Sequence, residues 1–105
     1  MPGPLIIRWI GEEQIARLAN TGRVAFYSIV SAMEGERVRI WFEQEARWLE
    51  AIVEKVLVRP KYREVAGLAE YSGFETADKW IEYETRRHKG SLPPYLILLR
   101  LAGTR

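Results

Sequence analysis

Apolar residues alternate or recur at helical spacing along the chain, and these patterns divide it into short elements. Residues 5–10 are apolar and β-branched apart from Arg8, residues 24–30 are mostly apolar, and residues 37–42 alternate, so each range is predicted to form a strand. Residues 12–21 place apolar side chains at helical spacing, and Gly22 suits the left-handed position that follows a helix. The N-terminal part is therefore predicted to run strand, helix, strand, strand.

The second half of the chain predicts a long strand, two helices and a last strand. Residues 46–58 make a run too long to stay straight, so a bend or β-bulge is expected within it. Residues 61–71 predict a short helix and a loop, and Thr76 is expected to cap a helix that runs to about His88. Residues 95–101 are almost continuously apolar and predict a central strand.

These elements favour a single α+β domain over residues 1–105. Five strands with two or three short helices favour a partly closed β-barrel with helices on its rim, and a four-stranded α+β sandwich is the alternative. A chain of 105 residues is long enough for one domain with its own core and too short for two.

The composition limits the chemistry that a site can use. The chain has no cysteine and a single histidine, so disulfides, thiolate metal sites and sites with several histidines are excluded, and we expect no metal and no cofactor. The N-terminus lacks the pattern of a signal peptide. No apolar run approaches the roughly 18–20 residues of a membrane span, so we expect a soluble, cytoplasmic protein that does not enter a membrane.

Arginine and aromatic residues favour a nucleic-acid partner. The net charge is only +2, yet the basic residues are twelve arginines and four lysines, and there are four tryptophans and five tyrosines. Arginine binds phosphate and aromatic rings stack on bases, so RNA or a nucleotide is the expected partner. The alternatives are a heat-stable protein with arginine–glutamate surface pairs and a tryptophan-filled core, and a homodimer formed through exposed aromatic side chains.

Two segments resemble a known domain family. ARLANTGR, leading into a strand and then EGERVRIWF, is followed later by GFETADKWIEYETRRHKGSLPPYLILLRL. In this order they resemble the ASCH domain, a branch of the PUA-like superfamily, over most of the chain. The resemblance implies a PUA-like barrel that binds RNA. It also implies a link to small ASCH amidohydrolases, which remove the acyl group from acetylated cytidine with the lysine and threonine of a G-x-K-x-x-E/T-x-R run.

The positions of that run are changed in this chain. Aligned on Gly22, the lysine position falls on Val24, the threonine or acid position on Tyr27 and the arginine position on Ile29. Valine can act neither as a base nor as an electrostatic partner, and Tyr27 is a poor substitute for a hydroxyl nucleophile. The neighbouring Arg23 stays protonated and cannot act as a base. The resemblance therefore favours a binding protein over an enzyme.

The first group of candidate ligand-binding residues is expected beside the first helix. It consists of Arg8, Arg23, Tyr27 and Ser28. An arginine would hold phosphate and the tyrosine would stack on a base. The alternatives are an Arg8 ion pair with Glu12 or Glu84, a solvated Arg23 and a tyrosine that packs on the rim of the barrel.

The second group surrounds Pro60 and consists of Arg59, Lys61 and Arg63. A basic loop suits phosphate contacts, and the alternative is a charged loop in solvent. A further feature is a ladder of arginine and tryptophan on two successive strands, formed by Arg37, Arg39, Trp41, Arg47 and Trp48. It is either a stacking platform for single-stranded nucleic acid or cross-strand packing on a solvated face.

Glu84 and His88 are the candidates for acid–base chemistry. They are four residues apart, so they meet on one face of the predicted helix. Together with Tyr27 they would serve a diverged hydrolase that acts on acylated nucleosides, as an amidohydrolase, or on RNA, as a ribonuclease. The alternative is a structural hydrogen bond that orients a histidine at the end of a helix.

Overall fold

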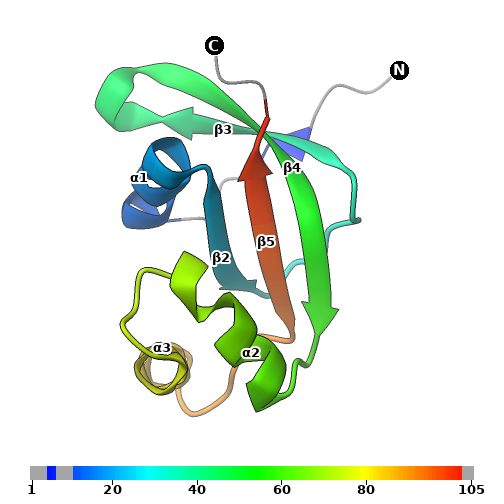
Figure 1. Cartoon of the computed structure of the whole chain (residues 1–105), viewed down its shortest axis with the longest axis vertical. Coiled ribbons are helices and arrows are strands. Elements are labelled where there is room, and N and C mark those ends of the chain that lie inside the picture. The colour runs from blue at the N-terminus through cyan, green and yellow to red at the C-terminus, as the bar shows by residue number, and fades with distance from the viewer. Residues whose placement is uncertain (1–4, 7–10, 103–105) are drawn as a thin grey trace.

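The chain folds into an α+β structure, shown in Figure 1 as a computed structural model that describes residues 5–6 and 11–102. The strands are β1 (Leu5–Ile6), β2 (Arg23–Ser28), β3 (Arg37–Phe42), β4 (Arg47–Val58) and β5 (Tyr95–Leu101). The helices are α1 (Glu12–Thr21), α2 (Tyr62–Leu68) and α3 (Ala77–Arg87), with single 3-10 turns η1 (Glu43–Glu45) and η2 (Ala69–Tyr71). The predicted order of elements is confirmed for these residues, and positions 7–10 of the predicted first strand lie outside them.

The strands form one sheet in the order β1-β3-β4-β5-β2. Strands β2 to β5 pair antiparallel, and the two-residue β1 joins β3 in parallel. Strand β5 lies between β4 and β2, so its predicted internal position is confirmed. Within the described residues β1 and β2 stand at opposite edges and do not pair with each other, so the sheet is not closed into a barrel. The α+β class is confirmed, whereas the predicted barrel is not.

The half of the sheet formed by β2 and β5 is buried on both faces. One face packs against Ile15 and Leu18 of α1, and the other packs against Val65 of α2 and Trp80 of α3. Successive side chains of a strand point to opposite faces, so a strand between two layers is apolar at every position. This explains the apolar run of β5, where Ile97 and Leu99 join the first core while Leu96 and Leu98 join the second.

Two glycines mark the ends of α1. Gly11 is the N-cap, and its backbone N–H donates to the side-chain oxygen of Gln14 at 3.0 Å. Gly22 has φ of 88°, in the left-handed region that glycine adopts without strain, and its N–H donates to the carbonyl of Leu18 at 2.9 Å. The predicted limits of this helix are confirmed.

Strand β2 ends at Ser28, two residues before the predicted limit. The Ser28 hydroxyl accepts the N–H of Val30 at 2.9 Å and donates to the carbonyl of Val30 at 2.6 Å. The side chain thus satisfies backbone groups that a continued strand would have offered to a neighbour, which is how serine starts turns.

The β3–β4 hairpin follows the predicted alternation. Val38, Ile40 and Phe42 are buried in the core that faces α1, while the intervening residues of β3 point to the opposite face. Strand β4 carries the predicted irregularity, a register shift between Val53 and Lys55. A strand of this length needs such a bulge to follow the curvature of the sheet.

Helix α3 starts at the predicted cap. The Thr76 hydroxyl accepts the N–H of Lys79 at 3.2 Å, and Ala77, Trp80 and Glu84 form the buried side of the helix. None of the helices in the described part of the chain is long and apolar enough to cross a membrane.

Candidate ligand-binding cleft

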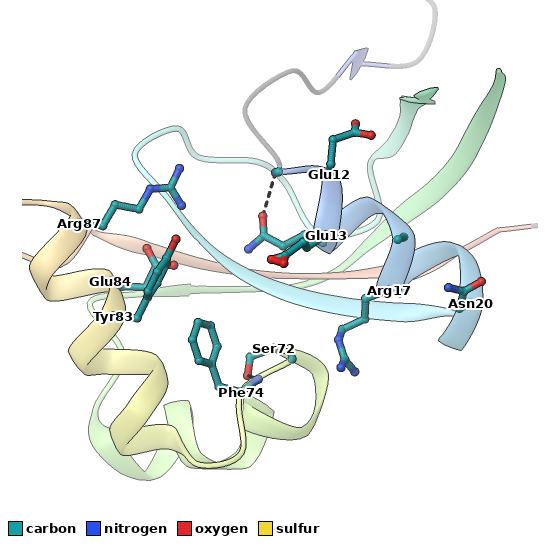
Figure 2. Close-up of a pocket in the computed structure, with 13 residues that line it drawn as sticks. Glu12, Glu13, Arg17, Asn20, Ser72, Phe74, Tyr83, Glu84 and Arg87 are labelled. Atoms are coloured by element: carbon teal, nitrogen blue, oxygen red, sulfur yellow. Dashed lines mark hydrogen bonds between the residues drawn. The ribbon is translucent and has the colours of Figure 1, made fainter. Parts of the chain in front are cut away.

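A cleft of about 830 Å³ lies between one side of α1, the loop after η2 and the C-terminal part of α3 (Figure 2). These three segments are far apart in the sequence, and they meet beside the edge strand β2, because α1 packs on one face of β2 and β5 and α3 packs on the other face. Each segment contributes side chains of a different chemistry to the cleft.

Helix α1 lines the cleft with a polar stripe that contains Glu13, Arg17 and Asn20. These residues are spaced by four and three, so they share one face of the helix. The apolar stripe that contains Ile15 and Leu18 is buried against the sheet. Because its apolar side is buried, the amphipathic helix α1 turns Arg17 and the acids Glu12 and Glu13 toward the cleft.

The loop after η2 is held in place by Ser72. Its hydroxyl donates to the carbonyl of Ala69 at 2.6 Å and accepts the N–H of Phe74 at 3.0 Å. Gly73 has φ of 92°, and a Cβ atom placed there would lie 3.1 Å from Nε of Arg17. The glycine therefore lets the Arg17 guanidinium approach the loop, as Figure 2 shows.

An aromatic pair lies in the cleft. The rings of Phe74 and Tyr83 have centroids 5.3 Å apart and planes tilted by 43°. Figure 2 shows Arg87 of α3 and Arg17 of α1 on either side of this pair. Among the described residues, neither guanidinium has a carboxylate within 4.0 Å. The cleft thus offers two guanidinium groups and two aromatic rings.

Glu84 is the buried acid in the wall of the cleft. Its residue is 3% exposed, and burial raises the pKa of its carboxyl group, although the charges of Arg87 and His88 act in the opposite direction. His88 Nε2 lies 3.4 Å from Glu84 Oε1, so the predicted i,i+4 contact is confirmed. A buried carboxyl group with a raised pKa can donate as well as accept a hydrogen bond over a wider pH range.

Tyr27 lies beneath the cleft rather than in its wall. The residue is 8% exposed, and its ring packs edge-on against Trp80 with centroids 5.3 Å apart. Burial, aided by the charge of Glu84, raises the pKa of Tyr27 to about 12. In the described part of the chain the Tyr27 hydroxyl and the Trp80 N–H have no hydrogen-bond partner.

Arg23 shares a face of β2 with Tyr27, as predicted, but lies at the opposite end of the strand, four residues and about 13 Å away. Its Nε donates to Oε1 of Glu54 at 2.9 Å. This hydrogen bond raises the pKa of Arg23 and lowers the pKa of Glu54. Arg8, the other arginine of this predicted group, lies outside the described residues.

The basic loop around Pro60 lies where β4 leads into α2. Arg59 has φ of 47°, and its N–H donates to the carbonyl of Pro94 at 2.6 Å. The N–H of Lys61 donates to the Glu64 carboxylate at 2.9 Å, which caps α2. Arg63 follows on an exposed turn of that helix.

None of the predicted ligand-binding residues that the structure describes lines the cleft.

Sequence reasoning missed Arg17, Phe74 and Arg87 as candidate site residues. The available signal was the polar stripe opposite the apolar face of each helix, with Arg17 on α1 and Arg87 on α3. A polar stripe of this kind is also the ordinary solvated face of a surface helix. It indicates a binding site only when the fold brings two such stripes together.

No family model matches this chain, and none of the curated proteins and none of the solved structures matches it either. The resemblance to the ASCH domain therefore rests on the sequence patterns alone and stays a prediction. Residues 5–6 and 11–102 contain no group of three or more His, Cys, Asp or Glu side chains placed to hold a metal ion.

Proposed function

We propose that the chain is an ASCH/PUA-like domain that binds a nucleotide, either free or within RNA, in the cleft between α1 and α3. The observation that carries this proposal is the pair of arginines, Arg17 and Arg87, that lie around the Phe74–Tyr83 aromatic pair and have no carboxylate within 4.0 Å among the described residues. A nucleotide combines a phosphate, which guanidinium groups bind, with a flat base, which aromatic rings stack upon. The cleft offers partners for both parts.

The size and the buried acid of the cleft agree with such a ligand. Its volume of about 830 Å³ falls within the roughly 300–1,000 Å³ that is typical of small-molecule sites. A raised pKa at Glu84 widens the pH range in which its carboxyl group is neutral, and in that range it does not repel a phosphate and can donate to an acceptor on a base edge. The acids Glu12 and Glu13 at the start of α1 make the cleft mixed in charge, which favours one or two phosphates over a long polyanion.

The order of elements supports the finer assignment of the fold. In this chain α1 separates β1 from β2, and the β3–β4 hairpin, two helices and a final strand follow. This is the order that the ASCH resemblance implies, and we class the sheet on that ground as an opened PUA-like barrel.

Titration calorimetry tests the proposal with the four ribonucleoside 5′-monophosphates, their nucleosides and a short RNA. We expect the monophosphates to bind more tightly than the nucleosides, with affinity that falls as salt rises. The change Arg87→Gln should weaken binding about tenfold or more, because a charge-assisted hydrogen bond contributes about 1.5–3 kcal/mol. Arg86→Gln is the matched control, since Arg86 is the neighbouring, exposed residue and pairs with Glu82 at 3.4 Å outside the cleft.

The arms of this titration also separate the two sources of the ligand. Tighter binding of the RNA than of any monophosphate would assign the site to RNA, and the reverse would assign it to a free nucleotide. Failure of every monophosphate and of the RNA to bind contradicts the proposal, as does an equal loss of affinity in Arg87→Gln and Arg86→Gln.

Glu84 favours one alternative function, hydrolysis of acylated nucleosides or of RNA. Its carboxyl group is buried in the cleft wall, has a raised pKa and lies 3.4 Å from His88, and these properties suit proton transfer. Incubation of the purified protein with acetylated cytidine and with labelled RNA tests this function beside a Glu84→Gln variant. Turnover no greater than that of the variant rejects it.

A further inference from the structure

A pair of half-exposed tryptophans lies on the outer face of the β3–β4 hairpin. Trp41 and Trp48 are direct cross-strand neighbours, with ring centroids 5.3 Å apart and planes at 67°. They are 39% and 40% exposed. The opposite face of the same strands is buried in the core through Ile40 and Leu49. The core therefore fixes the backbone of the hairpin while part of each ring remains in contact with solvent.

Each ring is held in its orientation by a polar neighbour. Trp41 Nε1 donates to Glu43 Oε1 at 2.7 Å. The guanidinium carbon of Arg39 lies 4.7 Å from the centroid of the Trp48 ring, which is cation–π geometry. Rings that are already held lose little conformational freedom when a ligand stacks on them.

Arginines extend this aromatic surface along β3. Arg39 and Arg37 lie two and four residues before Trp41 on the same face, which is about 7 and 13 Å along the strand. In the described part of the chain Arg39 has no carboxylate within 4.0 Å. Arg37 pairs with Glu50 at 3.4 Å, and both side chains are about half exposed or more. Exposed pairs of this kind contribute little and open easily.

The layer formed by α2 and α3 leaves this face uncovered. The second core, which these helices share with the sheet, contains residues of β2 and β5 and none of β3. Figure 1 shows the β3–β4 hairpin curving past α1, on the far side of the molecule from α2 and α3. Two adjacent exposed tryptophans on an open sheet face are unusual for a solvated surface, where large aromatic side chains are scattered singly.

We propose that this face, the hairpin platform (Arg37, Arg39, Trp41 and Trp48), binds single-stranded nucleic acid. Bases would stack on the tryptophan rings and the arginines would contact the phosphates. Aromatic side chains on a sheet, flanked by basic residues, are a general means of holding unpaired bases. The ring chemistry of the platform and the guanidinium of Arg39 complement this partner, and stacking alone gives little preference for sequence.

The platform is separate from the cleft, because none of its residues lines the cleft. Binding at the platform therefore does not depend on the proposed nucleotide site. An oligonucleotide that binds here should keep its affinity when Arg87 is changed, whereas a mononucleotide in the cleft should keep its affinity when Trp41 is changed. The two proposals can fail independently.

Fluorescence anisotropy with labelled oligo(U) and oligo(dT) tests the platform. Probes of roughly 12 nucleotides fall within the range of site sizes of single-strand binders. We expect Trp41→Leu and Trp48→Leu each to weaken binding at least fivefold, since the loss of one stacked base has about that effect. Tyr62→Leu is the matched control, because Tyr62 is an exposed aromatic residue on α2, away from the hairpin. It should leave the affinity unchanged.

Circular dichroism establishes that each variant is folded. If a tryptophan variant does not fold, Arg39→Gln and the quenching of wild-type tryptophan fluorescence by unlabelled oligonucleotide replace it. Fivefold weaker binding by Arg39→Gln, or quenching that saturates with the anisotropy signal, supports the platform. Unchanged affinity in the folded variants, or no oligonucleotide binding by the wild type at low salt, overturns it. A homodimer that Trp41→Leu dissolves, without any oligonucleotide binding, also overturns it and assigns the face to a second copy of the chain.

Discussion

The buried hydroxyl of Tyr27 provides a quantitative test of the packing beneath the cleft. The residue is 8% exposed, and its hydroxyl has no hydrogen-bond partner among the described residues. A buried polar group without a partner costs about 1–3 kcal/mol. Phenylalanine keeps the ring contact with Trp80 and removes the hydroxyl. We therefore expect Tyr27→Phe to raise the free energy of unfolding by at least about 1 kcal/mol, the lower end of that range.

Urea denaturation followed by circular dichroism measures this change. For a chain of this size, a gain of about 1 kcal/mol corresponds to a melting temperature higher by roughly 4–8 °C. Burial raises the pKa of Tyr27 to about 12, so the hydroxyl is neutral and the gain should be the same throughout the neutral range. The companion Tyr27→Ala removes the ring as well and should cost about 3–5 kcal/mol. Nucleotide affinity should be unchanged in Tyr27→Phe, since the residue does not line the cleft.

Two results would refute this reasoning. A loss of stability above about 1 kcal/mol in Tyr27→Phe would mean that the hydroxyl donates to a partner. The candidate partner is Glu84, whose charge acts on the Tyr27 hydroxyl. A double variant that combines Tyr27→Phe with Glu84→Gln would show whether the two groups share a hydrogen bond. A loss of nucleotide affinity in folded Tyr27→Phe would instead support the direct ligand contact that the sequence predicts for this residue.

Two further changes test the cleft wall. Burial raises the pKa of Glu84, so the folded state binds its proton more tightly than the unfolded state, and ionisation destabilises the fold as pH rises from the ordinary carboxyl pKa through the raised one. In pH-dependent denaturation Glu84→Gln should therefore be more stable than the wild type at neutral pH, with a difference that vanishes in acid; a difference that is the same at every pH would contradict this reasoning. Gly73→Ala puts a Cβ at positive φ and 3.1 Å from Arg17 Nε, so it should cost about 1–2 kcal/mol and weaken nucleotide binding in calorimetry. Gly67→Ala, in a helix with open space, should gain up to about 1 kcal/mol, and a similar gain in Gly73→Ala would contradict the account.

Local signals in the sequence predict most elements of the fold. The period of two in β3, with Val38 and Ile40 buried, follows directly from one buried face. Thr76 and Gly22 mark helix ends because their own side chain or backbone satisfies the terminal groups. Closure of the sheet is different, since it depends on whether its two edges meet. Whether the edges meet is set by the twist and curvature accumulated over all strands, which no local sequence pattern predicts.

The candidate site could be predicted only in part. The contact between Glu84 and His88 follows from helical spacing within one element and is confirmed. Arg17, Phe74 and Arg87 come together only because of how two helices and a loop pack against the sheet. No sequence motif predicts that packing. Tyr27 has the pattern of a strand residue that points away from the first core, and only the position of α3 decides that it is covered.

Amide chemical-shift mapping with a ribonucleoside monophosphate tests the central claim most directly. We predict that the largest shifts fall on the amides of residues 13–20, 72–74 and 83–87, the segments that carry most of the residues that line the cleft. Shifts that gather instead at Arg23 and at residues 59–63, or a spectrum that does not change at saturating nucleotide, would contradict it.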